Sequence, residues 1–191
     1  MPLNENALTT VDRLKLPIDN TSIEIYINAA SDVIENYCNT KFNKKPRSLN
    51  LKPDGGKYLM INYWNIESVE QILNDDEEIT EYTILAEKGM LYKKDEWPEL
   101  DDYDLEVNFT AGFILPKDAT AESPSTLPGG IENACILIAQ DLYWEQQRNP
   151  IIESQSRGGV STKYLSKRVT VYEKLPGPAL ALLKNWRFTP C

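Results

Sequence analysis

The sequence predicts an α+β fold, in which N-terminal and C-terminal helices build a helical core that is interrupted by a small antiparallel β insertion. One observation is that residues 127–148 repeat apolar side chains at the spacing of a broad helical face, typical of a helix packed between other elements. The other is a series of short alternating runs in the middle of the chain. We therefore expect a helical core from residues 1–45 and 114–191, and a β-rich insertion from residues 46–113.

The first element expected is a short helix over residues 7–16. Thr9 and Asp12 stand at the spacing of a capping box, although Asp is a weaker partner than Glu in the third position. Pro17 then ends the helix, because a proline cannot continue the helical hydrogen bonding.

A second helix is expected from about Ser22 to Cys38. Thr21 and Glu24 form a capping box at its start, either Asn20 or Thr21 is the expected N-cap, and Asn39 supplies a stop. The apolar face of this helix repeats at helical spacing and consists of Ile23, Ile27, Ala30, Ile34 and Tyr37.

The β block begins at Pro46, where helical periodicity gives way to alternation. Two alternating runs flank residues 53–56, Pro-Asp-Gly-Gly, which predicts a hairpin turn. Acidic turns at residues 74–78 and 99–102 separate the strands that follow. Those strands are expected at residues 68–73, 82–85, 90–92 and 104–109. This spacing favours a small antiparallel sheet or sandwich.

The central helix is expected to be the main core element. Residues 114–126 form an irregular connection before it, and Pro128 marks the boundary between this connection and the helix. The apolar face of the helix includes Ile138 and Leu142, and Trp144 is among the side chains that widen this face. A core helix is favoured here over a cofactor site.

Residues 155–162 follow the central helix and are expected to form a mobile loop, because they are polar and contain two adjacent glycines. Residues 169–172 are a candidate short strand. Leu175-Pro176 then introduces a last helix from Ala179 to Arg187, which carries apolar residues on one face.

Composition favours a globular protein without a membrane or secretory segment. The 191 residues are 41% hydrophobic, and no apolar run has the length of a membrane helix. The first residues lack the apolar stretch of a signal peptide. Cys38, Cys135 and Cys191 are odd in number and widely spaced, which argues against a disulfide framework or a cysteine metal site. A cytoplasmic folding environment is expected.

Charge and the lack of histidine narrow the function. Without histidine, Ser-His-Asp and Cys-His catalysis are excluded. The formal net charge of −9 argues against tight binding of nucleic acid, because phosphate binding relies on clustered Lys and Arg. It does not exclude DNA that passes nearby without being held.

No motif carries catalytic or cofactor chemistry. The acidic clusters at residues 75–78 and 101–106 lack the alternating ligands, central glycine and distant glutamate of an EF-hand, so solvated turns are the better interpretation. Gly55-Gly56-Lys57 is too short for a P-loop. We therefore expect no enzymatic activity, no cofactor and no metal.

The order of the segments resembles the head–tail connector proteins of tailed bacteriophages, also called adaptor or head-completion proteins. The resemblance covers both ends and the middle of the chain. It rests on Leu8–Leu16 with the helix to Cys38, on Val107–Phe113 with Pro116, on Leu127–Arg148, and on Leu175–Arg187. The β block departs from the smallest all-helical members and looks like the elaboration of larger relatives.

The resemblance implies a structural virion protein at the head–tail junction, assembled in the host cytoplasm and encoded by a phage or prophage. Such proteins form a homo-oligomeric ring, typically a dodecamer, beneath the portal protein. They extend the DNA channel and join the head to a tail-side connector or stopper protein. DNA passes through the channel without sequence-specific binding, no membrane is involved, and the isolated chain can be a monomer.

A ring subunit needs polar, adaptable surfaces that become ordered on assembly. Two segments fit this need, the polar loop with the basic residues that follow it, and the C-terminal segment. The basic residues also fit a plain solvated strand face. The candidate assembly residues are Ser154, Gln155, Ser156, Arg157, Gly158, Gly159, Lys167, Arg168, Trp186 and Arg187.

A second interpretation comes from another class of function. The chain would be a monomeric module whose β insertion binds a protein or a carbohydrate. A hydrolase that depends on acidic residues or a metal is a third interpretation, and it fits poorly because no constellation of side chains supports it.

Overall fold

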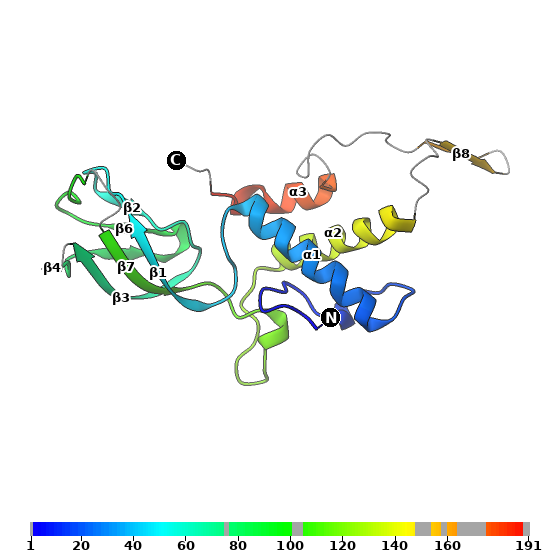
Figure 1. The fold of residues 1–191 in the computed structure, drawn as a ribbon, viewed down its shortest axis with the longest axis horizontal. Helices are drawn as coiled ribbons and strands as arrows, with labels where there is room; N and C mark the ends of the chain where they lie inside the picture. Colours follow the sequence, from blue (N-terminus) through cyan, green and yellow to red (C-terminus); the bar gives the residue numbers. More distant parts are fainter. Residues whose placement is uncertain are drawn as a thin grey trace. The chain divides into compact units, whose positions relative to one another are not determined.

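The computed structural model describes residues 2–74, 77–100, 105–147, 154–157, 160–163 and 175–188. This part of the chain has a mixed α+β fold, which confirms the predicted fold class (Figure 1). The helices are α1 (Asn20–Cys38), α2 (Gly129–Gln147) and α3 (Gly177–Leu183). The strands are β1 (Lys45–Leu51), β2 (Tyr58–Met60), β3 (Ile66–Asn74), β4 (Glu77–Glu78), β5 (Thr83–Leu85), β6 (Met90–Tyr92), β7 (Leu105–Ala111), β8 (Ser154–Arg157) and β9 (Val160–Lys163).

The chain divides into two compact units. The helical unit comprises Met1–Cys38 and Pro128–Arg187, and the β unit comprises Asn39–Leu127 with Phe188–Cys191. The chain thus leaves the helical unit after α1 and returns to it at α2. The ability of the β unit to fold as a separate insertion stays a prediction. None of the described helices has the length and hydropathy to cross a bilayer.

The N-terminal segment is mostly irregular, so the helix predicted for residues 7–16 is wrong. Only a three-residue 3-10 helix, Val11–Arg13, forms there. The reason is a set of long-range contacts that local periodicity does not reveal. Leu8 is fully buried, and its N–H donates to the Ser31 hydroxyl of α1 at 3.0 Å. Burial of a backbone group with a satisfied hydrogen bond outweighs the weak helical preference of this segment.

Glu132, in the first turn of α2, holds the same segment from the other side. Its Oε1 accepts the Thr9 hydroxyl at 3.2 Å, and its Oε2 lies 3.7 Å from Arg13 Nη1. The Thr9 hydroxyl therefore serves this long-range bond instead of the predicted capping box. A carboxylate at the start of a helix is also favoured by the helix dipole.

Helix α1 begins at a different cap from the one predicted. The Asp19 carboxylate accepts the Ser22 N–H at 3.0 Å and the Ser22 hydroxyl at 2.8 Å. The side-chain bond and then the backbone bond from Ser22 lower the pKa of Asp19. The predicted capping box of Thr21 and Glu24 is wrong, because Thr21 already lies inside the helix. Asn39 ends the helix as predicted, with a positive φ of 52°.

Helix α2 packs against both α1 and α3, which confirms the predicted central helix. On α1, the predicted face is buried except for Tyr37, which is partly exposed. On α2, Leu142 is partly exposed and Trp144 is 51% exposed, so the predicted widening of the buried face to Trp144 is wrong. The buried residues of α2 are Ile131, Ala134, Cys135, Ile138, Ala139 and Tyr143.

Helix α3 is shorter than the predicted range from Ala179 to Arg187. The α-helix ends at Leu183, and a 3-10 helix continues over Lys184–Trp186. Ala179 and Leu183 are buried, so this short helix packs through one face. Its hydrophobic stripe explains why the sequence pattern located it.

The β unit contains two antiparallel sheets, with strand orders β1-β7-β3-β4 and β2-β6-β5. Strand β7 alternates buried and partly exposed residues along its whole length, as a strand with one core face should. The core of the unit consists of Leu59, Ile61, Ile66, Ile72, Leu91, Trp97, Leu105, Val107, Phe109 and Ala111.

The hairpin predicted around residues 53–56 does not form. The turn is present, with Gly55 at a φ of 75°, but β1 pairs with β7 and β2 pairs with β6. The turn residues bond to a distant segment instead, because Trp97 N–H donates to Gly56 O at 2.9 Å and Leu100 N–H donates to Pro53 O at 3.5 Å. The two strands flanking the turn therefore enter different sheets.

Residues 154–157 and 160–163 are strands of a β-hairpin, so the loop predicted across these described residues is wrong. Strands β8 and β9 pair antiparallel, with Arg157 opposite Val160 and Ser154 opposite Lys163. A two-residue Gly-Gly connection between alternating runs is a recognised hairpin signal, which the sequence carried. The strand predicted at residues 169–172 lies outside the described residues.

Candidate functional site

The described residues offer no site for metal or thiol chemistry. No group of three or more His, Cys, Asp or Glu side chains among them is placed to hold a metal ion. Cys38 and Cys135 are buried, and burial raises the pKa of each thiol to about 12. Both thiols are therefore protonated near neutral pH and are poor nucleophiles. The surfaces available for binding are of more interest.

The predicted C-terminal residues lie at the end of the helical unit. Trp186 is partly exposed and Arg187 is exposed. The Arg187 guanidinium carbon lies 5.2 Å from the centroid of the Tyr37 ring, which is a cation–π geometry. Arg187 thus already covers the end of α1, and it remains accessible to a partner.

The other predicted assembly residues divide into two groups. Ser154, Gln155, Ser156 and Arg157 form strand β8 of the hairpin. Gly158, Gly159, Lys167 and Arg168 lie outside the described residues. The structure therefore places the first group on one strand, and the joining of these residues to Trp186 and Arg187 in one surface stays a prediction.

An aromatic group on the helical unit was missed by the sequence analysis. The rings of Tyr26 and Tyr143 meet edge to face at 5.7 Å, and Tyr143 meets Trp144 at 4.9 Å. The Tyr26 hydroxyl donates to the side-chain carbonyl of Gln146. Trp144 is the exposed member of this group, and a half-exposed tryptophan is a common anchor of protein interfaces. Its place on α2 beside buried Tyr143 hid it in the apolar pattern.

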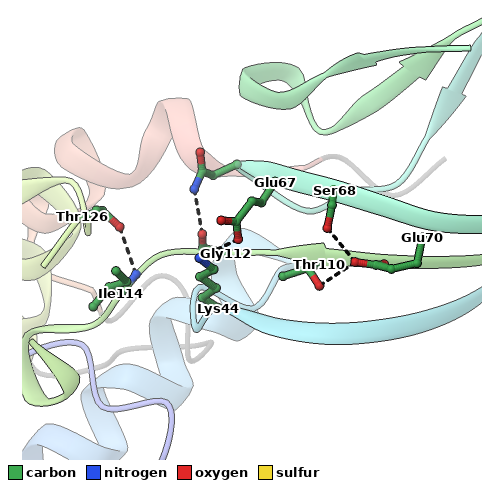
Figure 2. Close-up of polar contacts among 9 residues, drawn as sticks. Lys44, Glu67, Ser68, Glu70, Thr110, Gly112, Ile114 and Thr126 are labelled. Atoms are coloured by element: carbon green, nitrogen blue, oxygen red, sulfur yellow. Dashed lines mark hydrogen bonds and ion pairs between the residues drawn. The ribbon is translucent and has the colours of Figure 1, made fainter. Parts of the chain in front are cut away.

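The outer face of the four-stranded sheet is a polar network (Figure 2). Glu70 Oε1 accepts the Ser68 hydroxyl at 2.6 Å and the Thr110 hydroxyl at 3.0 Å. On the same strand as Thr110, Glu106 Oε1 accepts Asn108 Nδ2 at 3.1 Å. Hydroxyl and amide donors thus orient the carboxylates.

The end of strand β7 explains the glycine in the Val107–Phe113 stretch of the sequence. Gly112 has a φ of 111°, and a Cβ there would lie 2.5 Å from the backbone oxygen of Asn43. Gly112 O accepts Asn65 Nδ2 at 2.8 Å, and Lys44 Nζ lies 2.6 Å from Glu67 Oε2 beside it (Figure 2). This position therefore needs glycine for both its conformation and its close backbone contact.

A cleft of about 310 Å³ lies at the three-stranded sheet and was also missed. Tyr92 pairs with Tyr58 on one side and with Thr83 on the other, so these side chains share one face. Tyr58 is 57% exposed, and its ring centroid lies 5.3 Å from that of Tyr92. The lining residues of the cleft are Glu81, Tyr82, Thr83, Tyr92, Lys93, Lys94 and Asp95.

Comparison with protein families shows the family to which this chain belongs. The family model described as "Head completion protein" matches residues 3–188. The chain belongs to the head completion protein family. This confirms the resemblance drawn from the sequence, and it makes the chain a structural protein of a phage-type head–tail junction. Comparison with curated protein sequences finds no match.

Solved structures share the fold of this head completion protein. The neck of an empty gene transfer agent (GTA) particle, computed with C6 symmetry, contains a chain with a TM-score of 0.60 and 18% identity. The neck of a native GTA particle, computed with C12 symmetry, contains one with a TM-score of 0.58 and 16% identity. Each match covers 100% of this chain and 94% of the other. The fold of this chain is therefore shared with chains of these solved necks.

Proposed function

We propose that this head completion protein is one subunit of a ring that docks beneath the portal protein, extends the DNA channel and joins the head to a tail-side connector or stopper protein. The family match over residues 3–188 carries the proposal, because it includes sequence from both units. The C6 and C12 symmetries of the GTA necks that share the fold support a closed ring. A dodecamer is the ring size that we propose.

The charge of the chain suits a channel through which DNA must slide. With a net charge of −9, a ring of this protein repels the duplex and leaves it free to move. The polar face of the four-stranded sheet shows how such charges are held, because its carboxylates are oriented by neighbouring hydroxyls. Sequence-specific binding of DNA is not part of the proposal.

The contacts of the ring are proposed to use the hairpin, the C-terminal residues Trp186 and Arg187, and Trp144. These surfaces combine polar, adaptable groups with an aromatic anchor, as protein interfaces commonly do. The tyrosine-lined cleft supports a second candidate function, a module that binds a protein or carbohydrate, because aromatic rings beside carboxylates suit either ligand.

Light scattering on a size-exclusion column tests the proposal. The full chain is measured alone, and then after mixing with the portal protein from the same particle. A shift of this chain into a ring-sized complex with the portal is the expected result. A chain that stays monomeric beside intact portal assemblies at every salt concentration would contradict the ring proposal and favour the binding module.

A further inference from the structure

The β8–β9 hairpin has the properties of a strand donor. It forms a two-stranded sheet that joins no other strand of the described chain. An isolated two-stranded hairpin is marginally stable in water, and it gains most by pairing with a third strand. Its sequence is also basic in an acidic protein, since residues 154–163 contain Arg157 and Lys163 and no Asp or Glu. Arg157 and Lys163 belong to the paired strands themselves.

The β unit has a matching acceptor. Strand β5 is the end strand of the three-stranded sheet, and the cleft described above begins beside it, at Thr83. Residues 77–100 around this strand carry seven carboxylates against three lysines in the sequence. Added strands commonly bind at the edge of a sheet, where main-chain bonds give affinity and an adjoining pocket selects a side chain.

The cleft has the chemistry to take an arginine. Tyr82 and Tyr92 supply aromatic rings that favour a guanidinium by cation–π contact. Glu81 and Asp95 are exposed carboxylates that can pair with it through two parallel hydrogen bonds. Of the two lysines in the lining, Lys93 is held over the Trp97 ring, with Nζ 5.9 Å from its centroid.

We infer that the β8–β9 hairpin of one copy docks at the Tyr82–Tyr92 cleft of a second copy, pairs with the edge of β5 and places Arg157 among the tyrosines and carboxylates. The inference rests on the proposed ring. The contact is heterologous, because each subunit gives a hairpin and receives another, and such contacts close into a ring when the rotation between subunits fits. Charge complementarity favours a second copy of this chain as the occupant.

Cross-linking between two differently tagged chains tests the contact. One chain carries Arg157→Cys and the other carries Thr83→Cys, both with Cys191→Ser, while Cys38 and Cys135 stay buried. The chains are mixed, assembled with the portal and treated with a short bifunctional thiol reagent. A cross-linked species containing both tags is expected. The matched control replaces Thr83→Cys by Ser123→Cys, an exposed residue of the same unit outside the cleft.

The outcomes separate this inference from the ring proposal. Rings that form without the mixed cross-link, that link only within one chain, or that link equally well to the Ser123→Cys control overturn the docking. Failure to form any complex with the portal overturns the ring proposal and the docking with it.

A charge exchange provides an independent readout. Arg157→Glu or Glu81→Arg alone should raise the protein concentration needed for assembly about tenfold, because each change opposes like charges at the contact. The double variant should recover most of the loss. Equal assembly by all four proteins would overturn the pairing of Arg157 with the cleft, and far-UV circular dichroism checks that each variant is folded.

Discussion

Phe188 stacks on Trp64, with ring centroids 4.4 Å apart and ring planes inclined by 25°. Phe188 is 7% exposed, although it lies close to the end of the chain. Gly89 lies against the same ring, because a Cβ there would be 2.8 Å from Phe188 Cζ and 2.6 Å from Tyr63 O. The last described residue of the chain is therefore a core residue of the β unit.

We expect Phe188→Ala to destabilise the protein by about 3 kcal/mol, because it removes a buried aromatic side chain and leaves a cavity. Urea denaturation followed by tryptophan fluorescence measures the change. Tyr58→Ala is the control, since this ring is largely exposed and its loss should cost roughly 0.5 kcal/mol. An equal effect of both changes would show that Phe188 is not part of the core.

Ile138→Asp should unfold the helical unit. Ile138 is 2% exposed at the centre of α2, and an unpaired carboxylate buried there has no partner to compensate its lost hydration. Leu142→Asp should cost less, because Leu142 is partly exposed. Circular dichroism on heating measures both, with Ile25→Asp on the exposed side of α1 as the control. A cooperative transition for Ile138→Asp at the wild-type temperature would contradict this account of α2.

The two buried thiols should make the protein less stable at alkaline pH. The ordinary pKa of a cysteine thiol is 9.0, and burial raises the pKa of Cys38 and Cys135 to about 12. Between these values the unfolded chain loses thiol protons that the folded chain keeps, so the free energy of unfolding falls as pH rises above 9. Urea denaturation at pH 8 and pH 10.5 should show a smaller loss for the variant with Cys38→Ala and Cys135→Ala than for wild type. Parallel losses would contradict the raised pKa values.

Trp144→Ala should leave folding almost unchanged and weaken assembly. The ring is half exposed, so its removal costs roughly 0.5 kcal/mol of stability or less. As an interface anchor it would contribute about 2 kcal/mol to association, or roughly a thirtyfold change in affinity. Thermal denaturation and binding to the portal are measured side by side. Unchanged binding would remove Trp144 from the proposed interface.

The β unit should fold without the helical unit if it is a separable insertion. A fragment of residues 39–127 keeps both sheets, although it lacks Phe188. We therefore expect a cooperative but weakened transition by circular dichroism, and partial rescue by extending the chain with a linker that carries Phe188. A fragment that shows no cooperative transition with or without the linker would contradict a separable unit.

The local sequence pattern was sufficient to predict those helices and strands whose conformation is not changed by contacts with distant residues. The strand at Met90–Tyr92 was predicted to the residue, and α1 and α2 followed from helical spacing. Two of the failures involve distant partners. The apolar residues of segment 7–16 have helical spacing, but the Leu8 N–H donates a hydrogen bond to the hydroxyl of Ser31 in α1 instead of to a helical carbonyl. The turn at residues 53–56 has hairpin composition, but its backbone bonds to residues near Trp97.

The candidate surfaces were predictable to different degrees. The hairpin could have been found, since two glycines separate its alternating strands. The exposure of Trp144 could not, because periodicity identifies an apolar stripe without its edge. The tyrosine-lined cleft depends on the register that aligns Tyr58, Tyr92 and Thr83 across three strands. That register is set by long-range pairing, which no local window contains.

Backbone hydrogen bonds that join the two ends of the β unit affect how the chain folds. Lys44 N–H donates to Phe113 O at 3.0 Å, and Phe113 N–H donates to Phe42 O at 2.7 Å, so the two ends of this long excursion meet. The partners Ser31 and Cys135, on α1 and α2, are separated by 104 residues in sequence. Bringing such distant segments together costs loop-closure entropy unless the intervening chain is already compact. If the β unit folds first, most of that entropy cost is removed. We therefore expect α1 to pack against α2 only after the β unit has folded.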